Sequence, residues 1–138
     1  MADVFSRTKR SWVMSRIRNV NTRPEIIVRS FLHQRGFRFR LHASQLPGRP
    51  DIVLPKYQTV IFVHGCFWHS HHGCRNAVFP RTRSAFWRAK ILGNKQRDAK
   101  ALRHLRSLGW KVLVIWECET KAEQRLEKRL TALLQQKL

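Results

Sequence analysis

The sequence predicts an α/β domain in which a mixed β-sheet is flanked by helices. Three apolar runs, at residues 51–54, 57–64 and 110–116, have the length and composition of buried strands. Segments with the apolar spacing of helices lie at 23–35, at 84–108 and from 120 onward. With 138 residues the chain can bury one core without disulfides, and we find no internal repeat or linker in it. Residues 1–138 are therefore expected to form one domain.

The N-terminal part is predicted to hold two helices and a strand. Residues 6–19 resemble a short basic helix, which is either an arm lying on DNA or a solvated surface helix. The helix at 23–35 has Thr22 as its N-cap, Pro24 in its first turn and Gly36 as its stop. Alternating apolar and polar residues then predict a strand over 37–42 with one face in water.

The rest of the chain supplies the main sheet and its covering helices. The strands at 51–54 and 57–64 follow turn-forming residues and are expected to make a hairpin or meander. The helix at 84–108 is capped by Ser84 and ended by Gly109, and the strand at 110–116 is apolar enough to be buried on both faces. A capping-box sequence at 120–123 starts a last helix. The side chains expected to face the core are Ile91, Leu92, Ala99, Leu102, Leu105 and Leu108 of the long helix, Trp110 and Trp116 of the strand, and Leu126, Leu130, Leu133 and Leu134 of the last helix.

The charge of the chain indicates a polyanionic partner. There are 28 Lys and Arg residues against 8 Asp and Glu residues, which gives a net charge of +20. Such self-repulsion destabilises a compact monomer unless a polyanion shares its field, and the spread of basic residues suggests a wrapped DNA duplex. No segment approaches the roughly 18 apolar residues of a membrane-spanning helix. Without a signal peptide, and with an odd number of cysteines near histidines, the chain is expected in a reducing cytosol.

Three cysteines and a histidine indicate a zinc site. Nitrogen and sulfur ligands of this kind close a tetrahedral structural site, and the set here is Cys66, His71, Cys74 and Cys118. Cys66 and Cys118 each follow a predicted strand, and parallel neighbours would bring those two ends together. His72 competes with His71 for the fourth position, although Gly73 gives the chain room to turn and favours His71. The alternative is that the cysteines are small buried hydrophobes.

Asp51 indicates a second metal site. A carboxylate at the start of a buried strand must be paired, hydrogen-bonded or metal-bound, because an isolated buried charge is unfavourable. Arg49 is one possible partner, but His64 and His69 at the end of the neighbouring strand favour a magnesium site that would use Asp51 and a backbone carbonyl near Val63. Glu25 is explained either as part of a capping box with Thr22 or as a contact near that ion.

Two pairs of adjacent aromatic residues lie among basic residues, Phe67 with Trp68 and Phe86 with Trp87. Two consecutive bulky rings beside a ligand-bearing turn cannot both face one core. At least one of Phe67 and Trp68 is therefore expected to be exposed, where a ring can stack on a base or wedge between base pairs.

Four stretches of the chain are specific enough to be compared with a known family. They are residues 46–51 (LPGRPD), residues 60–69 (VIFVHGCFWH), Phe86 and Trp87 followed by Lys90, Ile91, Asn94, Arg97 and Asp98, and residues 109–118, which end in Trp116, Glu117 and Cys118. Together they resemble the very short patch repair (Vsr) mismatch endonucleases. The resemblance runs from Met1 to about Glu119. It implies a restriction-endonuclease-like core, a structural zinc ion, and a magnesium-dependent nick 5′ to the thymine of a T:G mismatch, the lesion left when 5-methylcytosine deaminates.

The resemblance also implies roles for individual residues. Asp51 is similar to the family's magnesium ligand, with the carbonyl of Val63 as a further contact, and His69 is similar to its general base. His64 would contact the phosphate, and Glu25 would be an auxiliary acidic group. Val63 stands where members commonly carry Thr, and Gly73 adds a residue that some members lack. The zinc set matches Cys66, His71, Cys74 and Cys118, the intercalating aromatics match Phe67, Trp68 and Trp87, and the further expected DNA contacts are Arg7, Arg10, Arg16, Lys90 and Asn94.

The sequence thus predicts a monomeric, bacterial, cytoplasmic and nucleoid-associated endonuclease for T:G mismatches in double-stranded DNA, with mismatch-repair proteins as possible partners. Two alternatives stay open. One is a site-specific nicking or restriction enzyme that acts on matched DNA, and the other is a zinc-stabilised DNA-binding protein without catalysis.

Overall fold

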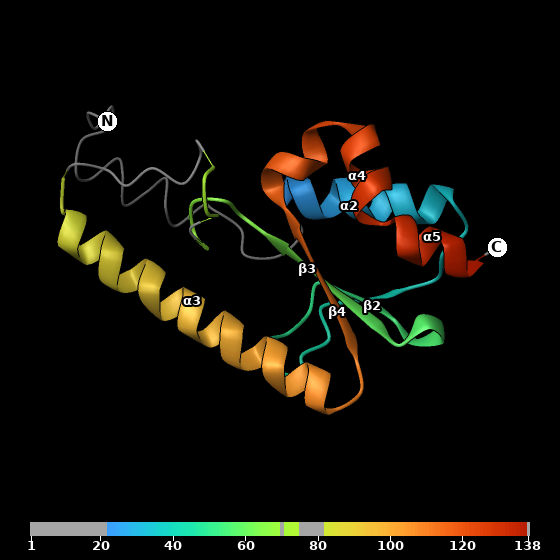
Figure 1. Ribbon diagram of the computed structural model, residues 1–138, viewed down its shortest axis with the longest axis horizontal. Helices are drawn as coiled ribbons and strands as arrows, with labels where there is room; N and C mark the ends of the chain where they lie inside the picture. Colours follow the sequence, from blue (N-terminus) through green and yellow to red (C-terminus); the bar gives the residue numbers. More distant parts are fainter. Residues whose placement is uncertain (1–21, 70, 75–81, 138) are drawn as a thin grey trace.

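The computed structural model describes residues 22–69, 71–74 and 82–137, and there a four-stranded sheet lies between helices (Figure 1). The strand order is β1 (Arg40–Leu41), β2 (Ile52–Leu54), β3 (Thr59–His64), β4 (Lys111–Trp116). The first three strands pair antiparallel and β4 runs parallel to β3. The prediction of a mixed sheet flanked by helices is therefore confirmed. The predicted helix at 6–19 lies outside the described residues.

The hairpin of β2 and β3 is confirmed. The 3₁₀ helix η1 (Pro55–Tyr57) and Gln58, whose φ of 48° is left-handed, join the two strands. The strand expected over 37–42 is wrong in length, because only β1 pairs with β2. At its end His42 takes a left-handed φ of 48°, which interrupts the regular strand. Leu41, on the apolar side of the predicted alternation, is exposed.

Helix α2 (Arg23–Gln34) begins at the expected cap, since the Thr22 hydroxyl accepts a hydrogen bond from the N–H of Glu25 at 3.4 Å. Helix α3 (Ser84–Ser107) is also confirmed, but Arg83 rather than Ser84 occupies its N-cap. The inward face of α3 was partly wrong: Leu92, Ala99 and Leu108 are exposed, whereas Trp87, Ile91 and Leu105 are buried. The N-terminal half of α3 runs past the strands (Figure 1), and there Trp87 packs on Phe67 and Trp68 instead of on the sheet.

Strand β4 is not buried on both faces as expected. Only Ile115 is buried in it, because β4 lies at the edge of the sheet within the described part of the chain. Trp110 packs half-buried against the core beneath α3. Trp116, also assigned to the core, is half-buried and contacts histidines instead.

The C-terminal helix was expected to be continuous from residue 120, and this is wrong. The 3₁₀ helix η3 (Glu117–Lys121) is followed by α4 (Glu123–Arg129) and α5 (Thr131–Lys137). Thr120 is buried, and its hydroxyl donates to the carbonyl of Glu117 at 2.7 Å instead of capping α4. The apolar stripe is confirmed, with Leu126, Leu130 and Leu133 buried and Leu134 packed against them.

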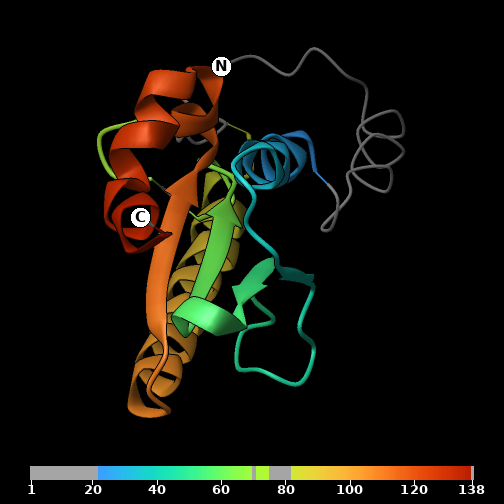
Figure 2. The ribbon, with the colours of Figure 1, turned by 90° about the vertical axis from the view of Figure 1, so that its right-hand side faces the viewer.

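The sheet divides the core into two layers. Ile61 and Ile115 pack toward α2, α4 and α5, whereas Val60 and Phe62 pack toward α3. Figure 1 shows the strands between α3 and the other helices, and in Figure 2 α3 lies behind β3 and β4. Since side chains alternate along a strand, His64 at the end of β3 faces the α3 side. No helix among the described residues is long and apolar enough to cross a membrane.

Candidate active site and metal centre

A cleft of about 700 Å³ lies where β2 begins and β3 ends. The loop at 42–51 forms one wall, α3 forms another, and the end of β3 forms the floor. Gly48 allows the loop to approach α3 closely. Its φ is 72°, and a Cβ atom there would lie 2.6 Å from the Cβ of Ala101 on α3. Among the lining residues are Asp51, Val63, His64 and His69, which were predicted, and His42, Arg97 and Asp98, to which sequence reasoning assigned no role.

Asp51 lies just before β2, beside the end of the neighbouring strand β3. Its Oδ2 accepts a hydrogen bond from the N–H of Val63 at 2.7 Å. Burial raises the pKa of Asp51 to about 6, with the Val63 hydrogen bond opposing and the nearby charge of Glu25 adding to the rise. The ionised carboxylate is thus disfavoured until a cation offsets its desolvation. This environment fits a hard divalent ion, which binds carboxylate oxygens.

Glu25 reaches toward the same place from α2. The side chain is 2% exposed, and its Oε1 lies 2.5 Å from Nε2 of His42. The backbone N–H of His42 in turn donates to the carbonyl of Asp51 at 3.1 Å. Glu25 is therefore not only part of a helix cap, since it is linked through His42 to Asp51 in the cleft. The sequence predicts the contact of Glu25 with Thr22, which is local. It does not predict the contact with His42, because those two residues are 17 positions apart.

His69 and His64 form a stacked pair. Their ring centroids are 3.8 Å apart with an interplanar angle of 4°, and Nδ1 of His69 lies 2.5 Å from Oδ2 of Asp98 on α3. Burial lowers the pKa of His64 to about 4, and the neighbouring His69 lowers it further while Asp98 opposes. His64 is therefore neutral at physiological pH, whereas a carboxylate orients His69. Asp98 could have been found by its place four residues after Asn94, on the helix face that carries Trp87 and Ile91.

The predicted zinc residues come together beside this cleft. One donor atom from each of Cys66, His71, Cys74 and Cys118 lies within 4.8 Å of the others. Nδ1 of His71 is 3.6 Å from Sγ of Cys66 and 3.5 Å from Sγ of Cys118. His72 is exposed and is not one of these four residues. Parallel pairing of β3 and β4 brings Cys66 and Cys118 together as expected, and the four residues could hold a metal ion.

The thiols at this cluster are strongly perturbed. Burial raises the pKa of Cys66 to about 12, and burial also raises the pKa of Cys118. Buried thiols stay protonated without a cation, and a bound metal would favour the thiolates. Three sulfurs and one imidazole nitrogen are a donor set that fits zinc. The N–H of Cys66 also donates to Oε1 of Glu117 at 3.3 Å, which ties the loop after β3 to the segment after β4.

Trp116 lies between the histidines and the cluster. Its ring stacks on His71, with centroids 4.1 Å apart and an interplanar angle of 7°. The same ring meets His64 edge-on at 5.3 Å and His69 at 6.5 Å. The sequence does not predict these contacts with histidines, because a tryptophan in an apolar strand is expected to lie in the hydrophobic core.

The predicted intercalating aromatics gather near the N-terminal end of α3. Phe67 and Trp68 are half-buried, Trp87 is buried, and the three rings contact one another with centroids 5.1 to 5.8 Å apart. Nζ of Lys90 lies 5.5 Å from the ring of Trp68, and Nδ2 of Asn94 donates to the Trp68 carbonyl at 2.9 Å. Asn94 thus fixes the loop that carries Trp68. Arg7, Arg10 and Arg16 lie outside the described residues.

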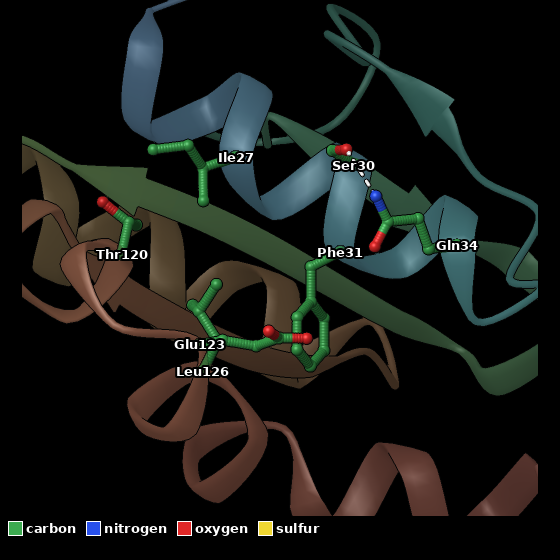
Figure 3. A pocket seen from close by; sticks show the side chains of 7 residues that line it. All are labelled: Ile27, Ser30, Phe31, Gln34, Thr120, Glu123 and Leu126. Carbon is green, nitrogen blue, oxygen red and sulfur yellow. Dashed lines mark hydrogen bonds between the residues drawn. The ribbon is translucent and has the colours of Figure 1, made fainter.

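A smaller cavity of about 250 Å³ lies on the other side of the sheet, between α2 and the segment from η3 to α4 (Figure 3). Ile27, Phe31 and Leu126 form its apolar part, and Nε2 of Gln34 donates to Oγ of Ser30 at 3.5 Å at its rim. Its lining contains no histidine or cysteine. The potential catalytic and metal-binding groups found among the described residues are therefore at the end of β3 and β4.

Comparison with known proteins gives a consistent result. A family model described as DNA mismatch endonuclease Vsr matches residues 2–76. The chain is 48% identical over 134 residues to the type II nicking enzyme V.XorIIP of Xanthomonas oryzae pv. oryzae, covering 97% of this chain and 98% of that protein. It is 44% identical over 136 residues to the type II nicking enzyme V.NmeAIP of Neisseria meningitidis, covering 99% and 96%. It is 42% identical over 137 residues to the DNA mismatch endonuclease Vsr of Escherichia coli, covering 99% and 87%.

Proposed function

The chain belongs to the Vsr family of DNA endonucleases, and from this premise we propose that it nicks one strand of double-stranded DNA 5′ to the thymine of a T:G mismatch. The observation that carries this proposal is the pair of His69 and Asp98 in the same cleft as Asp51. An imidazole oriented by one carboxylate, with a second, half-buried carboxylate lining the same cleft, is the arrangement expected for metal-assisted hydrolysis of a phosphodiester. Membership of an endonuclease family sets aside the alternative of a DNA-binding protein without catalysis.

In this proposal the residues of the cleft divide into two groups. Asp51 and the carbonyl of Val63 would hold Mg²⁺, with Glu25 as an auxiliary acidic group linked to the site through His42. The ion, one or two in number, would supply positive charge that stabilises the phosphate as its own negative charge develops. A Thr hydroxyl is absent at position 63, but a backbone carbonyl does not depend on the side chain, so Val63 is compatible with the role.

The histidines would carry the proton transfer. Asp98 holds Nδ1 of His69, which leaves Nε2 as the nitrogen that can accept a proton from the attacking water. Neutral His64, stacked on His69, adds no positive charge that would disfavour protonation of its neighbour. With one ring nitrogen protonated, His64 would donate a hydrogen bond to the phosphate.

The remaining predicted residues would bind DNA and support the fold. Phe67, Trp68 and Trp87 would wedge at the mismatch, where unstacking is less unfavourable than in a matched duplex, and Lys90 lies beside them. The net charge of +20 supports wrapping of the duplex, with residues 1–20 as a basic arm that includes Arg7, Arg10 and Arg16. Zn²⁺ at Cys66, His71, Cys74 and Cys118 would tie β3 to β4.

We further propose a single restriction-endonuclease-like domain that acts as a monomer in the bacterial cytoplasm, at the nucleoid, with mismatch-repair proteins as possible accessory partners.

A second candidate is a nicking enzyme that acts on matched DNA at a specific site. It is favoured by one observation, namely that the relatives at 48% and 44% identity carry the name of type II nicking enzymes. The cleft chemistry would be the same in both cases, because only the contacts to the bases would differ.

One experiment separates these candidates. A labelled duplex with one T:G mismatch is incubated with the protein and Mg²⁺, beside its matched T:A counterpart and an Asp51→Ala variant. Nicking of the mismatched duplex alone, absent in the variant, supports the mismatch endonuclease. Nicking of both duplexes supports the second candidate. Equal loss of DNA binding and of nicking in the variant would contradict the metal-binding role of Asp51.

A further inference from the structure

Trp116 makes ring contacts with two groups of residues that have different tasks. On one face it stacks in parallel on His71, which belongs to the Cys/His cluster, with centroids 4.1 Å apart. Against His64 and His69 of the cleft it packs nearly at right angles, with interplanar angles of 75° and 71°. A parallel and a perpendicular contact together restrain both the position and the tilt of a ring.

The backbone holds Trp116 in this place. Trp116 is the direct register partner of His64 in the parallel pairing of β3 and β4, so the two side chains leave the sheet on the same face. The N–H of Trp116 donates to Oε1 of Glu119 at 2.9 Å, which fixes the end of β4. The backbone of Trp116 is therefore fixed, and its indole starts from the face of the sheet that carries His64.

The His71 ring contacts the cluster and Trp116 with different parts of its surface. Its Nδ1 points at the sulfurs of Cys66 and Cys118, whereas the flat face of its ring rests on Trp116. A metal ion bound by the four cluster residues would fix the His71 ring, because ligating histidines take their orientation from the metal and from what the rest of the ring contacts. A change at the cluster would then alter the surface against which Trp116 rests.

We propose that Trp116 is a positioning residue, which transmits the state of the Cys/His cluster to the catalytic histidines His64 and His69. The cluster thus sets the efficiency of nicking in addition to holding the fold together. The effect on nicking rests on the proposed function, whereas the coupling between the two groups of histidines does not.

Two substitutions test the positioning role. In Trp116→Leu the flat surface is lost, whereas Trp116→Phe keeps an aromatic ring of smaller area. Trp110→Leu is the matched control, because Trp110 is also half-buried and flanks β4 but packs on the core beneath α3. With Co²⁺ at the cluster, all variants should bind one equivalent and show the same thiolate-to-cobalt absorption.

Nicking kinetics give the first readout. Supporting residues around metal sites typically contribute about 10- to 100-fold to activity, so kcat should fall at least about 10-fold in Trp116→Leu while KM for DNA stays within about twofold. Trp116→Phe should recover most of the rate, and Trp110→Leu should nick like the unmodified protein. Unchanged kcat in Trp116→Leu, or an equal loss in Trp110→Leu, would overturn the proposal.

A second readout does not need nicking. The protein is loaded with one equivalent of either Zn²⁺ or Cd²⁺, a larger ion, and the ring resonances of His64 and His69 are followed by NMR. Exchange of the ion should move both sets of resonances in the unmodified protein and in Trp110→Leu, but not in Trp116→Leu. Unmoved resonances in the unmodified protein would overturn the coupling. If the resonances move although no DNA substrate is nicked, the proposed function fails and the coupling stands.

Discussion

Oδ2 of Asp98 lies 2.5 Å from Nδ1 of His69, although the two residues are 29 positions apart in the chain. The carboxylate comes from the middle of α3, and the imidazole comes from the loop after β3. Crossing from β3 through α3 to the parallel strand β4 is what places the helix over the end of β3. One connection therefore both completes the sheet and brings the orienting carboxylate to the histidine.

Replacing Asp98 by asparagine should lower kcat by about 100-fold or more, because an amide can stabilise the wrong tautomer of His69. Binding to mismatched DNA should change little, since Asp98 contributes no positive charge. Single-turnover nicking and a binding titration measure the two effects. Gln96→Ala, an exposed change on the same helix, serves as the control. Full activity of Asp98→Asn would rule out the orienting role.

Stabilisation by Mg²⁺ should be lost below about pH 6. Burial raises the pKa of Asp51 from 3.8 to about 6, so a cation must displace a proton below that value. A raised folded-state pKa also means that the metal-free protein loses stability as the pH rises from about 3.8 toward 6. We expect Mg²⁺ to raise Tm at pH 7.5 and to have little effect at pH 5. Asp51→Asn should show no rise at either pH, and a rise of the same size at both pH values in the unmodified protein would contradict this prediction.

The Cys/His cluster should bind zinc with a strong dependence on pH. Since burial raises the pKa of Cys66 to about 12, and that of Cys118 as well, each thiolate formed on binding releases a proton. Affinity should rise with pH, by up to about tenfold per pH unit for each such thiol. Competition with a chelator at several pH values measures this. His71→Gln and Cys118→Ser should lose zinc and melt at lower temperature, whereas His72→Gln should keep one equivalent of zinc. Loss of zinc in His72→Gln but not in His71→Gln would show that His72 is the ligand.

Gly48→Ala should damage the cleft more than Gly109→Ala. Both glycines have positive φ, 72° and 94°, but only at Gly48 would a Cβ atom meet a neighbour, at 2.6 Å from Ala101. Backbone strain alone should reduce the free energy of unfolding by about 1 kcal/mol in Gly109→Ala. In Gly48→Ala the loop must also move away from α3, so nicking should fall together with stability. Urea unfolding and nicking assays on both variants test this, and equal effects would argue against the close approach.

The local parts of the fold could be predicted from the sequence. Thr22 and Pro24 mark the start of α2, and the apolar runs mark β2, β3 and β4. The predictions that were wrong concern burial, which depends on the other elements that a helix or strand packs against. The apolar strand β4 lies at the edge of the sheet in the described part of the chain, and Leu92 on α3 and Leu108 just after it are exposed. Periodicity records which face of an element is apolar, but not how much of that face is covered.

In the candidate site, too, local features could be predicted from the sequence, whereas contacts between distant segments could not. Cys66 and Cys118 could be paired from sequence because each follows a strand, and parallel strands align their ends. The partners of Glu25 and His69 could not be predicted, because His42 and Asp98 come from segments whose placement depends on the tertiary fold. Trp116 was assigned to the core because apolar neighbours in a strand give the same pattern whether a ring covers leucines or histidines.

The late position of β4 in the chain has a consequence for the cell. A polypeptide that stops before residue 111 already carries Asp51, His64, His69 and Asp98, together with most of the positive charge that attracts DNA. It lacks β4, the parallel partner of β3, and with it Trp116 and Cys118. Nascent chains on the ribosome and fragments left by interrupted synthesis should therefore adhere to the chromosome without breaking it. Competence to cut DNA would arrive only with about the final fifth of translation.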